Sequence, residues 1–401
     1  MTDTDIFYKK TVTLPVGKRS LQLDVAQALF SSHEVDSGTK MLLKSLAKSQ
    51  YAAQWRQILD VGCGYGALGL ALKAADKRRK VDMVDRDALA VAFTQRNAEK
   101  NGLAVTAVGS LGYDAVPNPP YDLIVSNIPG KAGEAVITDL LTQARHFLHP
   151  DGMVAVVIVA PLADLVRRVL SALPDVVLLY EESNRFYAVF HYRFTGPPSG
   201  VYETAVSRHL YARHNGTFQF KKATFHMETV KGLPEFDTLS YQTRLLMNQM
   251  ERQDDSRMRR VMLVNPGQGH LAVAAWLGWQ PEAVLMVDKD LLALQTAAAN
   301  LQHNGCPSER IYLFHQPTWR LPDVEPPVDG LLGVLRDSDG PVINGRLLET
   351  AVAHLTPHAA CHIAANSHLI SQLATRLTPP WREQGKRKKR KGFSAVTLSS
   401  G

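Results

Sequence analysis

One glycine-rich segment of the chain has the residue types of a loop that binds a nucleoside. The stretch 60–66 (DVGCGYG) follows a short apolar run and leads into a segment with helical spacing. Glycines permit a tight turn and a close approach of a ligand to the backbone. Asp85 ends the next apolar run, 19 residues after Gly66, where a carboxylate can bind both ribose hydroxyls of a nucleoside cofactor. These residues predict a cofactor site in the first half of the chain.

The glycine-rich stretch allows two other interpretations. Its glycines are compatible with a strand–helix turn that needs them only for packing. Gly64, Gly66 and Gly69 also fit the GxGxxG spacing of nicotinamide-dependent dehydrogenases. Two features argue against a dehydrogenase. Asp60 suits a cationic ligand that carries an amino acid, and the stretch 176–194 is typical of an antiparallel hairpin.

Short apolar runs alternate with longer amphipathic stretches along the first half of the chain. Such alternation predicts an α/β fold with a mostly parallel sheet and helices on both faces. The terminal hairpin makes one strand antiparallel. The predicted strands are 57–61, 80–84, 106–108, 122–126 and 153–159, and the predicted helices include 88–101 and 135–147.

The second half of the chain repeats the pattern of the first. Gly64 matches Gly267 and Asp85 matches Asp288, each pair 203 residues apart. Further along the chain the offset becomes 207. A constant offset followed by one small insertion indicates the duplication of a whole domain. We therefore expect a first copy over 1–194, a linker over 195–200 and a second copy over 201–401.

The composition is that of a globular protein that is basic in one place. Of its 401 residues, 45% are hydrophobic and 21% are charged, which excludes a mainly disordered, collagen-like or coiled-coil protein. The net charge is +7. Six cations form one run, expected in a protruding hairpin loop that suits RNA phosphates: Lys386, Arg387, Lys388, Lys389, Arg390 and Lys391. A solvated hairpin tip is the alternative interpretation of this run.

The placement of cysteine and histidine predicts neither a disulfide framework nor a metal site. Cys63, Cys306 and Cys361 are far apart, the chain has no CxxC pair, and no HExxH motif occurs. The N-terminus lacks the apolar core of a signal peptide, and the longest apolar run, 153–160, is too short to cross a bilayer. We therefore expect a cytoplasmic protein without a membrane segment.

Together these features resemble class I S-adenosylmethionine-dependent methyltransferases. That family has an Asp-x-Gly-x-Gly-x-Gly loop, an acidic residue at the end of the second strand and a terminal strand hairpin. The upstream segment 30–43 is similar to the segment that leads the "methyltransferase small" domain of tandem-domain bacterial ribosomal RNA guanine 2-amino methyltransferases. The resemblance implies two tandem Rossmann-like domains, with 1–194 as the catalytic domain and S-adenosyl-L-methionine as the cofactor.

The resemblance also assigns cofactor contacts to matching positions. Asp60, Gly62, Gly64 and Gly66 line the methionine part of the cofactor, Asp85 holds the ribose, Ser110 contacts the adenine edge and Thr39 borders the pocket. Ser110 and Thr39 are equally compatible with ordinary loop capping. No metal takes part in this scheme.

Enzymes of this class that methylate exocyclic amines carry Asn/Asp-Pro-Pro-aromatic after the fourth strand. The amine is a poor nucleophile because its lone pair is delocalised, and an amide oxygen that accepts its hydrogens turns the lone pair toward the methyl group. The segment SNIPGK, which begins at Ser126, supplies Asn127 and Pro129 as the catalytic pair. Gly130 replaces the aromatic residue that would stack on a base. Either another side chain supplies that ring, or the substrate is not a nucleobase, or turnover is poor.

A literal NPPY motif at residues 118–121 is rejected as the site. It precedes the predicted strand 122–126, whereas ligands bind at the carboxyl ends of parallel strands. A loop that enters the strand explains its prolines. A purely structural turn also remains an alternative for Asn127 and Pro129.

The second copy has lost the residues that carry this chemistry. Leu263 replaces the acidic residue, Asn265 replaces the first glycine, and Pro266 removes a backbone donor. The segment 333–336 (GVLR) stands where SNIP stands in the first copy. We expect a degenerate domain kept for packing or for holding substrate. In the guanine methyltransferases the second copy is the active one, so their target nucleotide is not transferred to this chain.

The sequence favours a methyltransferase that acts on an exocyclic amine of RNA, with structured ribosomal RNA as the expected partner. The second copy and its basic run would hold that RNA. A small-molecule or protein methyltransferase is the first alternative, because Gly130 lacks the ring. A non-catalytic RNA-binding protein with two relic domains is the second.

Overall fold

The computed structural model describes residues 3–29, 34–198, 200–251, 258–323, 325–375 and 381–400. Within these ranges the chain forms two compact units. The first runs from Phe7 to Tyr211, and the second begins at Ala212 and includes the described residues that precede Phe7. No helix in the described ranges is long and apolar enough to cross a membrane.

The boundary between the units lies further along the chain than the predicted linker at 195–200. Beyond that linker the Tyr202 hydroxyl donates a hydrogen bond of 2.6 Å to Asp114 of the first unit. The first unit continues to Tyr211. Ser199, inside the predicted linker, lies outside the described residues.

The first unit is built on a seven-stranded sheet with the strand order β5-β4-β3-β6-β7-β9-β8. Strands β3 to β7 are parallel, and β8 and β9 form an antiparallel hairpin at the end of the sheet. The predicted α/β class, the parallel sheet and the terminal hairpin are thus confirmed. The strands are β3 (Gln57–Val61), β4 (Lys80–Asp85), β5 (Thr106–Gly109), β6 (Tyr121–Asn127), β7 (Leu148–Val159), β8 (Val176–Ser183) and β9 (Tyr187–Phe194).

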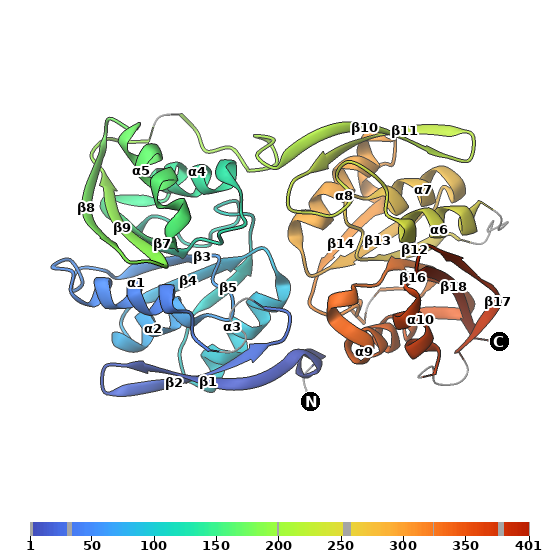
Figure 1. The fold of residues 1–401 in the computed structure, drawn as a ribbon, viewed down its shortest axis with the longest axis horizontal. Helices are drawn as coiled ribbons and strands as arrows, with labels where there is room; N and C mark the ends of the chain where they lie inside the picture. Colours follow the sequence, from blue (N-terminus) through green and yellow to red (C-terminus); the bar gives the residue numbers. More distant parts are fainter. Residues whose placement is uncertain are drawn as a thin grey trace. The chain divides into compact units, whose positions relative to one another are not determined.

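Helices cover both faces of this sheet, with α1, α2 and α3 on one face and α4 and α5 on the other (Figure 1). Each helix buries an apolar stripe, and Leu42, Phe93 and Leu141 are fully buried. The helix predicted at 135–147 ends as an α-helix at Gln143 and continues as a 3-10 turn. The helices are α1 (Ser37–Ala47), α2 (Ala67–Ala75), α3 (Ala88–Lys100), α4 (Glu134–Gln143) and α5 (Ala163–Ser171).

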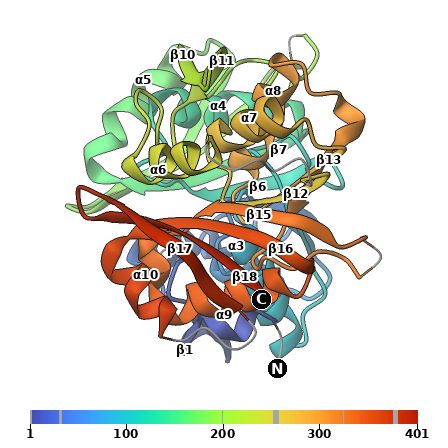
Figure 2. The same cartoon turned by 90° about the vertical axis from the view of Figure 1, so that its right-hand side faces the viewer.

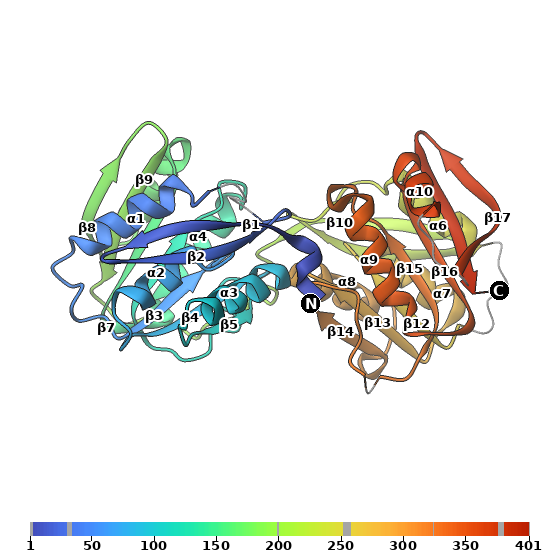
Figure 3. The same cartoon turned by 90° about the horizontal axis from the view of Figure 1, so that it is seen from below.

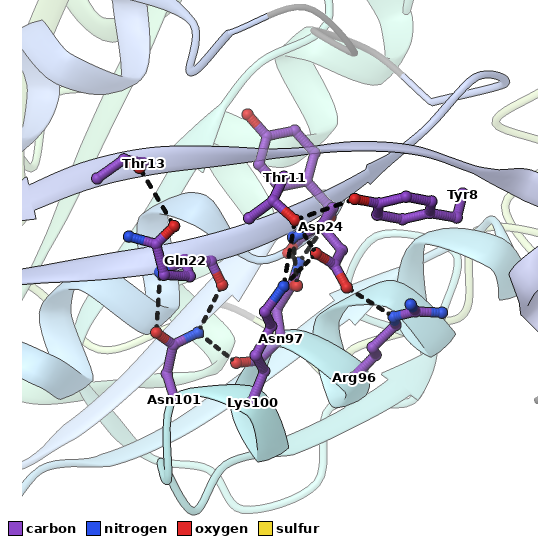
Figure 4. Close-up of polar contacts among 10 residues, drawn as sticks. Tyr8, Thr11, Thr13, Gln22, Asp24, Arg96, Asn97, Lys100 and Asn101 are labelled. Carbon is purple, nitrogen blue, oxygen red and sulfur yellow. Dashed lines mark hydrogen bonds and ion pairs between the residues drawn. The ribbon is translucent and has the colours of Figure 1, made fainter.

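The N-terminal hairpin, β1 (Tyr8–Val16) and β2 (Arg19–Ala26), is an element that the apolar pattern does not predict. It lies across helices α2 and α3 (Figure 3). The Asn97 side chain accepts a hydrogen bond of 2.7 Å from the Asp24 N–H and donates one of 2.9 Å to the Asp24 carbonyl (Figure 4). Asn97 also donates to the Tyr65 carbonyl at 2.8 Å, so one buried amide joins the hairpin to the glycine-rich loop.

The second unit repeats this architecture, with α6, α7 and α8 on one face of its sheet and α9 and α10 on the other (Figure 1 and Figure 2). The strand order is β14-β13-β12-β15-β16-β18-β17, so β17 is an edge strand. The hairpin β10–β11 corresponds to β1–β2, and Asn300 bonds both backbone groups of Glu228 as Asn97 bonds those of Asp24. The strands are β10 (Ala212–Phe220), β11 (Ala223–Val230), β12 (Arg260–Val264), β13 (Ala283–Asp288), β14 (Ile311–His315), β15 (Val328–Val334), β16 (Leu355–Asn366), β17 (Trp381–Arg390) and β18 (Phe393–Ser400), and the helices are α6 (Tyr241–Met250), α7 (His270–Trp279), α8 (Leu291–His303), α9 (Gly340–Val352) and α10 (Ser367–Ala374).

Candidate active site

The carboxyl ends of the parallel strands of the first unit meet at one edge of its sheet. The strand order reverses between β3 and β6, because β4 and β5 follow β3 on one side and β7 follows β6 on the other. Ligands of open α/β sheets bind at such a switch point. Ser126 Oγ donates a hydrogen bond of 2.7 Å to the Val61 carbonyl, which ties β6 to β3 there. The predicted residues at this edge include Asp60, Gly62, Asp85 and Asn127.

The glycine-rich loop presents an open backbone surface. Gly62, Gly64 and Gly66 adopt φ angles of 75°, 57° and 93°, which residues with a side chain rarely adopt. The Gly62 N–H donates to the Val84 carbonyl at 2.8 Å, which anchors the loop on β4. A Cβ atom on Gly62 or Gly64 would meet no atom within 4 Å, whereas one on Gly66 would lie 2.9 Å from Leu70 Cδ1. A ligand can therefore approach Gly62 and Gly64, while Gly66 lets α2 start next to the loop.

Asp85 ends β4 and braces the same loop. One carboxylate oxygen accepts a hydrogen bond of 2.9 Å from the Gly64 N–H, and the other accepts one of 2.9 Å from the Asp87 N–H. Burial raises the pKa of Asp85 above its ordinary value. The residue is still partly exposed, and each oxygen keeps a further lone pair that can accept a hydrogen from a ribose hydroxyl.

Asp60 lies beneath the loop and is 1% exposed. Its Oδ2 accepts a hydrogen bond of 2.8 Å from the Gly69 N–H in the first turn of α2. Burial, with a smaller contribution from the charge of Asp85, raises the pKa of Asp60 to about 7. Two neighbouring carboxyl groups disfavour each other's ionisation, and a bound cation would relieve that repulsion. This part of the site therefore suits a ligand that carries an ammonium group.

Asn127 ends β6, and two partners fix its side-chain amide. Nδ2 donates to Asp36 Oδ2 at 2.9 Å and to Thr39 Oγ1 at 3.0 Å. Because a carboxylate can only accept hydrogen bonds, the group that faces Asp36 must be the NH2 of Asn127. Both amide hydrogens are thus in use, and the described residues provide no donor to Oδ1. The amide oxygen is the group left to accept hydrogens from a ligand.

Two residues of this arrangement, Asp36 and Tyr187, are missing from the predicted site. Asp36 caps α1 by accepting a hydrogen bond of 3.1 Å from the Thr39 N–H, and its Oδ1 accepts one of 2.7 Å from the Tyr187 hydroxyl. Burial and the hydrogen bond to Asp36 raise the pKa of Tyr187 to about 12, so this hydroxyl is a donor at neutral pH. An Asp directly before a helical stretch is an N-cap signal that could have found Asp36. Residues 30–33 of the predicted leading segment lie outside the described residues.

The other predicted residues of this edge differ in their roles. Thr39 borders Asn127, and Pro129 and Gly130 are exposed in the turn that follows it. Ser110 is 2% exposed, and its hydroxyl donates to the carbonyl two residues further on and accepts from the N–H five residues further on, at 3.0 and 2.9 Å. The Ser110 side chain therefore closes its own loop, as a capping residue does.

The NPPY motif lies at the opposite end of β6, which agrees with its rejection as the site. Asn118 Nδ2 and the Tyr121 hydroxyl both donate to Asp82 Oδ2, at 3.1 and 3.0 Å. These bonds use the polar groups of the motif to hold the start of the strand. Across the described ranges, no group of three or more His, Cys, Asp or Glu residues could hold a metal ion.

In the second unit the equivalent edge is occupied by the unit's own side chains. Leu263, at the position of Asp60, is 1% exposed and part of the core. Asn265 replaces the first glycine, adopts a φ of 52°, and donates to the Val334 carbonyl at 2.9 Å. Val334 stands at the position of Asn127 and has no side-chain amide.

Asp288 keeps the acidic position of Asp85 but has an internal partner. Arg336, at the position of Pro129, forms an ion pair with the buried Asp288 carboxylate. The Asp290 N–H also donates to Asp288, at 2.9 Å. The retained acid thus serves the turn and the ion pair, which supports the interpretation of the second copy as degenerate.

The basic run lies in a strand, and the prediction of a protruding loop is wrong. Residues 386–390 belong to β17, and Lys391 and Gly392 form the two-residue turn to β18, both with positive φ. Arg387 forms an ion pair with Glu383 at 2.7 Å. An edge strand tolerates such charges because one side of its backbone is unpaired and faces solvent, where cations also discourage strand–strand aggregation.

Comparisons with known proteins place the first unit in a family. The model of the methyltransferase small domain family matches residues 20–189. The protein YbxB of Bacillus subtilis is 30% identical over 154 residues, which are 37% of this chain and 74% of YbxB. The ribosomal RNA small subunit methyltransferase C of Actinobacillus pleuropneumoniae (strain AP76) is 33% identical over 143 residues, which are 35% of this chain and 43% of that protein. The matched stretch thus spans less than half the length of this second relative.

A solved structure shares the fold of the whole chain. The T. thermophilus 16S rRNA N2 G1207 methyltransferase (RsmC), in complex with AdoMet and guanosine, matches over 100% of both chains with a TM-score of 0.70 and 17% identity. The fold and the edge of the first sheet define a class I methyltransferase domain. The chain belongs to the methyltransferase small domain family.

Proposed function

We propose that the protein is an S-adenosyl-L-methionine-dependent methyltransferase that modifies an exocyclic amine of a ribosomal RNA base. The orientation of Asn127 carries this proposal. Asp36 and Thr39 hold its NH2 group, so its amide oxygen is the acceptor at the carboxyl end of β6. The hydrogens of an exocyclic amine are the donors that such an oxygen would accept.

The glycine-rich loop and two acids would hold the cofactor. Gly62 and Gly64 offer backbone that a Cβ atom would otherwise cover. The carboxyl groups of Asp60 and Asp85 provide a negative potential for an ammonium group, and Asp85 provides acceptors for the ribose hydroxyls. S-adenosylmethionine supplies an activated methyl group when bound. The presence of AdoMet in the T. thermophilus structure supports this assignment.

The residues of the chain act by positioning the amine. When Asn127 Oδ1 accepts one amine hydrogen, the nitrogen lone pair turns out of conjugation and toward the methyl donor. Pro129 fixes the φ angle of the following turn and so helps to keep Asn127 in place. With the cofactor bound, Asn127 would keep the amine nitrogen facing the activated methyl group, and the proton released on methylation would pass to water.

The second unit is proposed to bind RNA rather than to catalyse. Its equivalent edge is filled by Arg336 and Asp288. Lys386, Lys389 and Lys391 are exposed on β17 and its turn, where cations can bind RNA phosphates. Relatives named ribosomal RNA small subunit methyltransferase C support ribosomal RNA as the substrate. Such a substrate would place the reaction in the cytoplasm.

Replacing Asn127 by Ala tests the catalytic role. Transfer of a radiolabelled methyl group to unmodified ribosomal RNA transcripts should fall by about a hundredfold or more, because the positioned acceptor is lost. Binding of S-adenosylmethionine, measured by calorimetry, should stay close to wild type. Asn118→Ala is the matched control, since it removes the exposed Asn at the other end of the same strand. Equal losses of transfer and cofactor binding in Asn127→Ala would contradict the role.

Replacing Asp85 by Ala tests the cofactor site. Cofactor affinity should fall, because the substitution removes an acceptor for the ribose hydroxyls and the hydrogen bond that holds the Gly64 N–H. Absence of binding to the wild-type protein at millimolar S-adenosylmethionine would contradict both enzymatic hypotheses, and salt-dependent RNA binding would then favour the non-catalytic alternative. Transfer to small molecules or proteins but to no RNA would favour the alternative that Gly130 suggests.

A further inference from the structure

Phe186 is an exposed aromatic residue at the same edge of the sheet as Asn127. It is 57% exposed. It directly precedes β9, which is antiparallel to β7 and therefore begins where the parallel strands end. The next residue, Tyr187, bonds Asp36, which in turn bonds Asn127. Phe186 thus lies one residue away from the network that fixes the proposed amine acceptor.

The backbone of Phe186 is held on both sides. Its N–H donates to Asn184 Oδ1 at 2.8 Å, and its carbonyl accepts a hydrogen bond of 2.7 Å from the Ala160 N–H. The Arg185 guanidinium lies 4.5 Å from the centre of the Phe186 ring, in a cation–π contact. The ring therefore has a defined place and a positive charge beside it.

Gly130, which lacks the aromatic ring of its motif, adjoins the same support. A Cβ atom on Gly130 would lie 3.1 Å from Val159 Cγ2. Val159 is the last residue of β7, and the next residue, Ala160, holds the carbonyl of Phe186. Both residues therefore adjoin the end of β7. Gly130 lies next to the Val159 side chain, and the Phe186 carbonyl is bonded to the Ala160 N–H.

The second unit has no ring at the position of Phe186. Its Ser367 N–H donates to the Gly392 carbonyl at 2.8 Å, as the Ala160 N–H donates to the carbonyl of Phe186. Gly392 therefore stands where Phe186 stands in the first unit, so the exposed ring belongs only to the copy that keeps Asn127.

We propose that Phe186, backed by Arg185, is the platform on which the target base stacks, in place of the ring that Gly130 lacks. The inference rests on the proposed function and deepens it. Asn127 would hold the amine, and Phe186 would hold the plane of the base that carries it. Such a platform selects planar aromatic substrates and so favours a nucleobase over an aliphatic amine.

Replacing Phe186 by Ala tests the platform in the full-length protein. The KM for ribosomal RNA transcripts should rise about five- to a hundredfold, the range expected for the loss of one base–aromatic stack. The kcat should change much less, because stacking is equally present in the ground state and the transition state. Phe186→Tyr should restore the wild-type KM, while Phe186→Leu should not. Phe236→Ala is the matched control, because Phe236 is also exposed beneath an arginine, with Arg213 at 4.5 Å.

A fluorescence experiment separates this inference from the proposed function. In Phe186→Trp, with S-adenosylhomocysteine present to prevent turnover, guanosine or adenosine should change the indole emission, whereas Phe236→Trp should show no change. If wild-type protein methylates RNA but Phe186→Ala keeps the wild-type KM, the platform is refuted and the proposed function stands. If wild-type protein methylates no RNA, the proposed function fails, and the Phe186→Trp titration still decides whether a base stacks there. An emission unchanged by both nucleosides would overturn the inference.

Discussion

Replacing Asp60 by Asn should separate what this carboxyl group does for the fold from what it does for the ligand. Asp60 is 1% exposed and accepts a hydrogen bond of 2.8 Å from the Gly69 N–H. The side-chain oxygen of Asn can accept the same bond, so the local geometry is retained. The substitution removes the negative charge and replaces the other carboxylate oxygen by an NH2 group of similar size. Leu263 at the equivalent position of the second unit shows that this fold accommodates an uncharged residue there.

The pKa of Asp60 sets the magnitude and its dependence on pH. Burial, assisted by the charge of Asp85, raises this pKa from 3.8 to about 7. In the unfolded chain the group ionises near pH 4, so between pH 4 and pH 7 the folded state binds more protons than the unfolded state. Stability contributed by Asp60 is therefore fully present below pH 4 and is lost as the pH rises to 7. At 1.36 kcal/mol per pH unit, the loss above pH 7 is about 4 kcal/mol.

Chemical denaturation of wild type and Asp60→Asn at pH 4.5 and pH 8 measures this effect. At pH 8 the variant should unfold with a free energy higher by up to about 4 kcal/mol, and at pH 4.5 by roughly 1 kcal/mol or less. The transition to follow is that of the first unit, reported by Trp55. At pH 8 calorimetry should show weaker binding of S-adenosylmethionine to the variant, because the charge that favours its ammonium group is gone. A variant less stable than wild type at pH 8, or one that binds the cofactor equally well, would refute the reasoning.

Three further outcomes follow from contacts away from the proposed chemistry. Asn97→Ala should lower the free energy of unfolding by roughly 2–5 kcal/mol, because it leaves buried backbone groups without the three hydrogen bonds that now satisfy them. Asn300→Ala should have the same effect in the second unit, and chemical denaturation of both variants checks this. Arg336→Ala should cost about 3 kcal/mol by leaving Asp288 unpaired, and an Asp288→Ala/Arg336→Ala double variant should recover part of that loss in a double-mutant cycle. Replacing the cations of residues 386–391 by Gln should weaken RNA binding and flatten its salt dependence while leaving cofactor affinity unchanged, as filter binding at several salt concentrations and calorimetry can show.

The parts of the site that the sequence predicts are those that depend on short spacings. The loop 60–66 and the carboxylate of Asp85 follow from glycines and acids at the ends of apolar runs, since parallel strands bring their carboxyl ends to one edge. Asn127 follows in the same way from its position after β6. Each of these needs only a strand, a turn and a count of residues.

The parts that the sequence does not predict depend on contacts between distant segments. Tyr187 bonds Asp36 across 151 positions of the chain, and no local pattern marks it as part of the site. The hairpin β1–β2 is exposed along much of β1, so its apolar pattern is weak. The basic run is predicted as a hairpin loop because it lies between the last two apolar segments of the second copy, yet pairing with β18 extends β17 through the run as an edge strand.

The duplication supplies an internal test of which residues the fold requires. Positions that both copies keep serve the fold: Gly66 and Gly269 each start a helix with positive φ, and Asn97 and Asn300 each bind a hairpin. A shared residue is therefore weak evidence for catalysis here, and Asp288, which pairs with Arg336, shows that even the position proposed to bind ribose in the first copy can be kept for structure.

Positions that differ between the copies carry the stronger functional signal. The second unit folds with Leu263 for Asp60, Val334 for Asn127 and Phe393 for Tyr187, so this architecture does not need the first copy's residues for folding. The residues that the second copy has lost are the buried acid with a raised pKa, the oriented amide and the hydroxyl that reaches Asp36. Because packing alone does not explain a buried acid that lowers stability at neutral pH, selection for a bound cation is the simplest physical reason for its presence in the first copy.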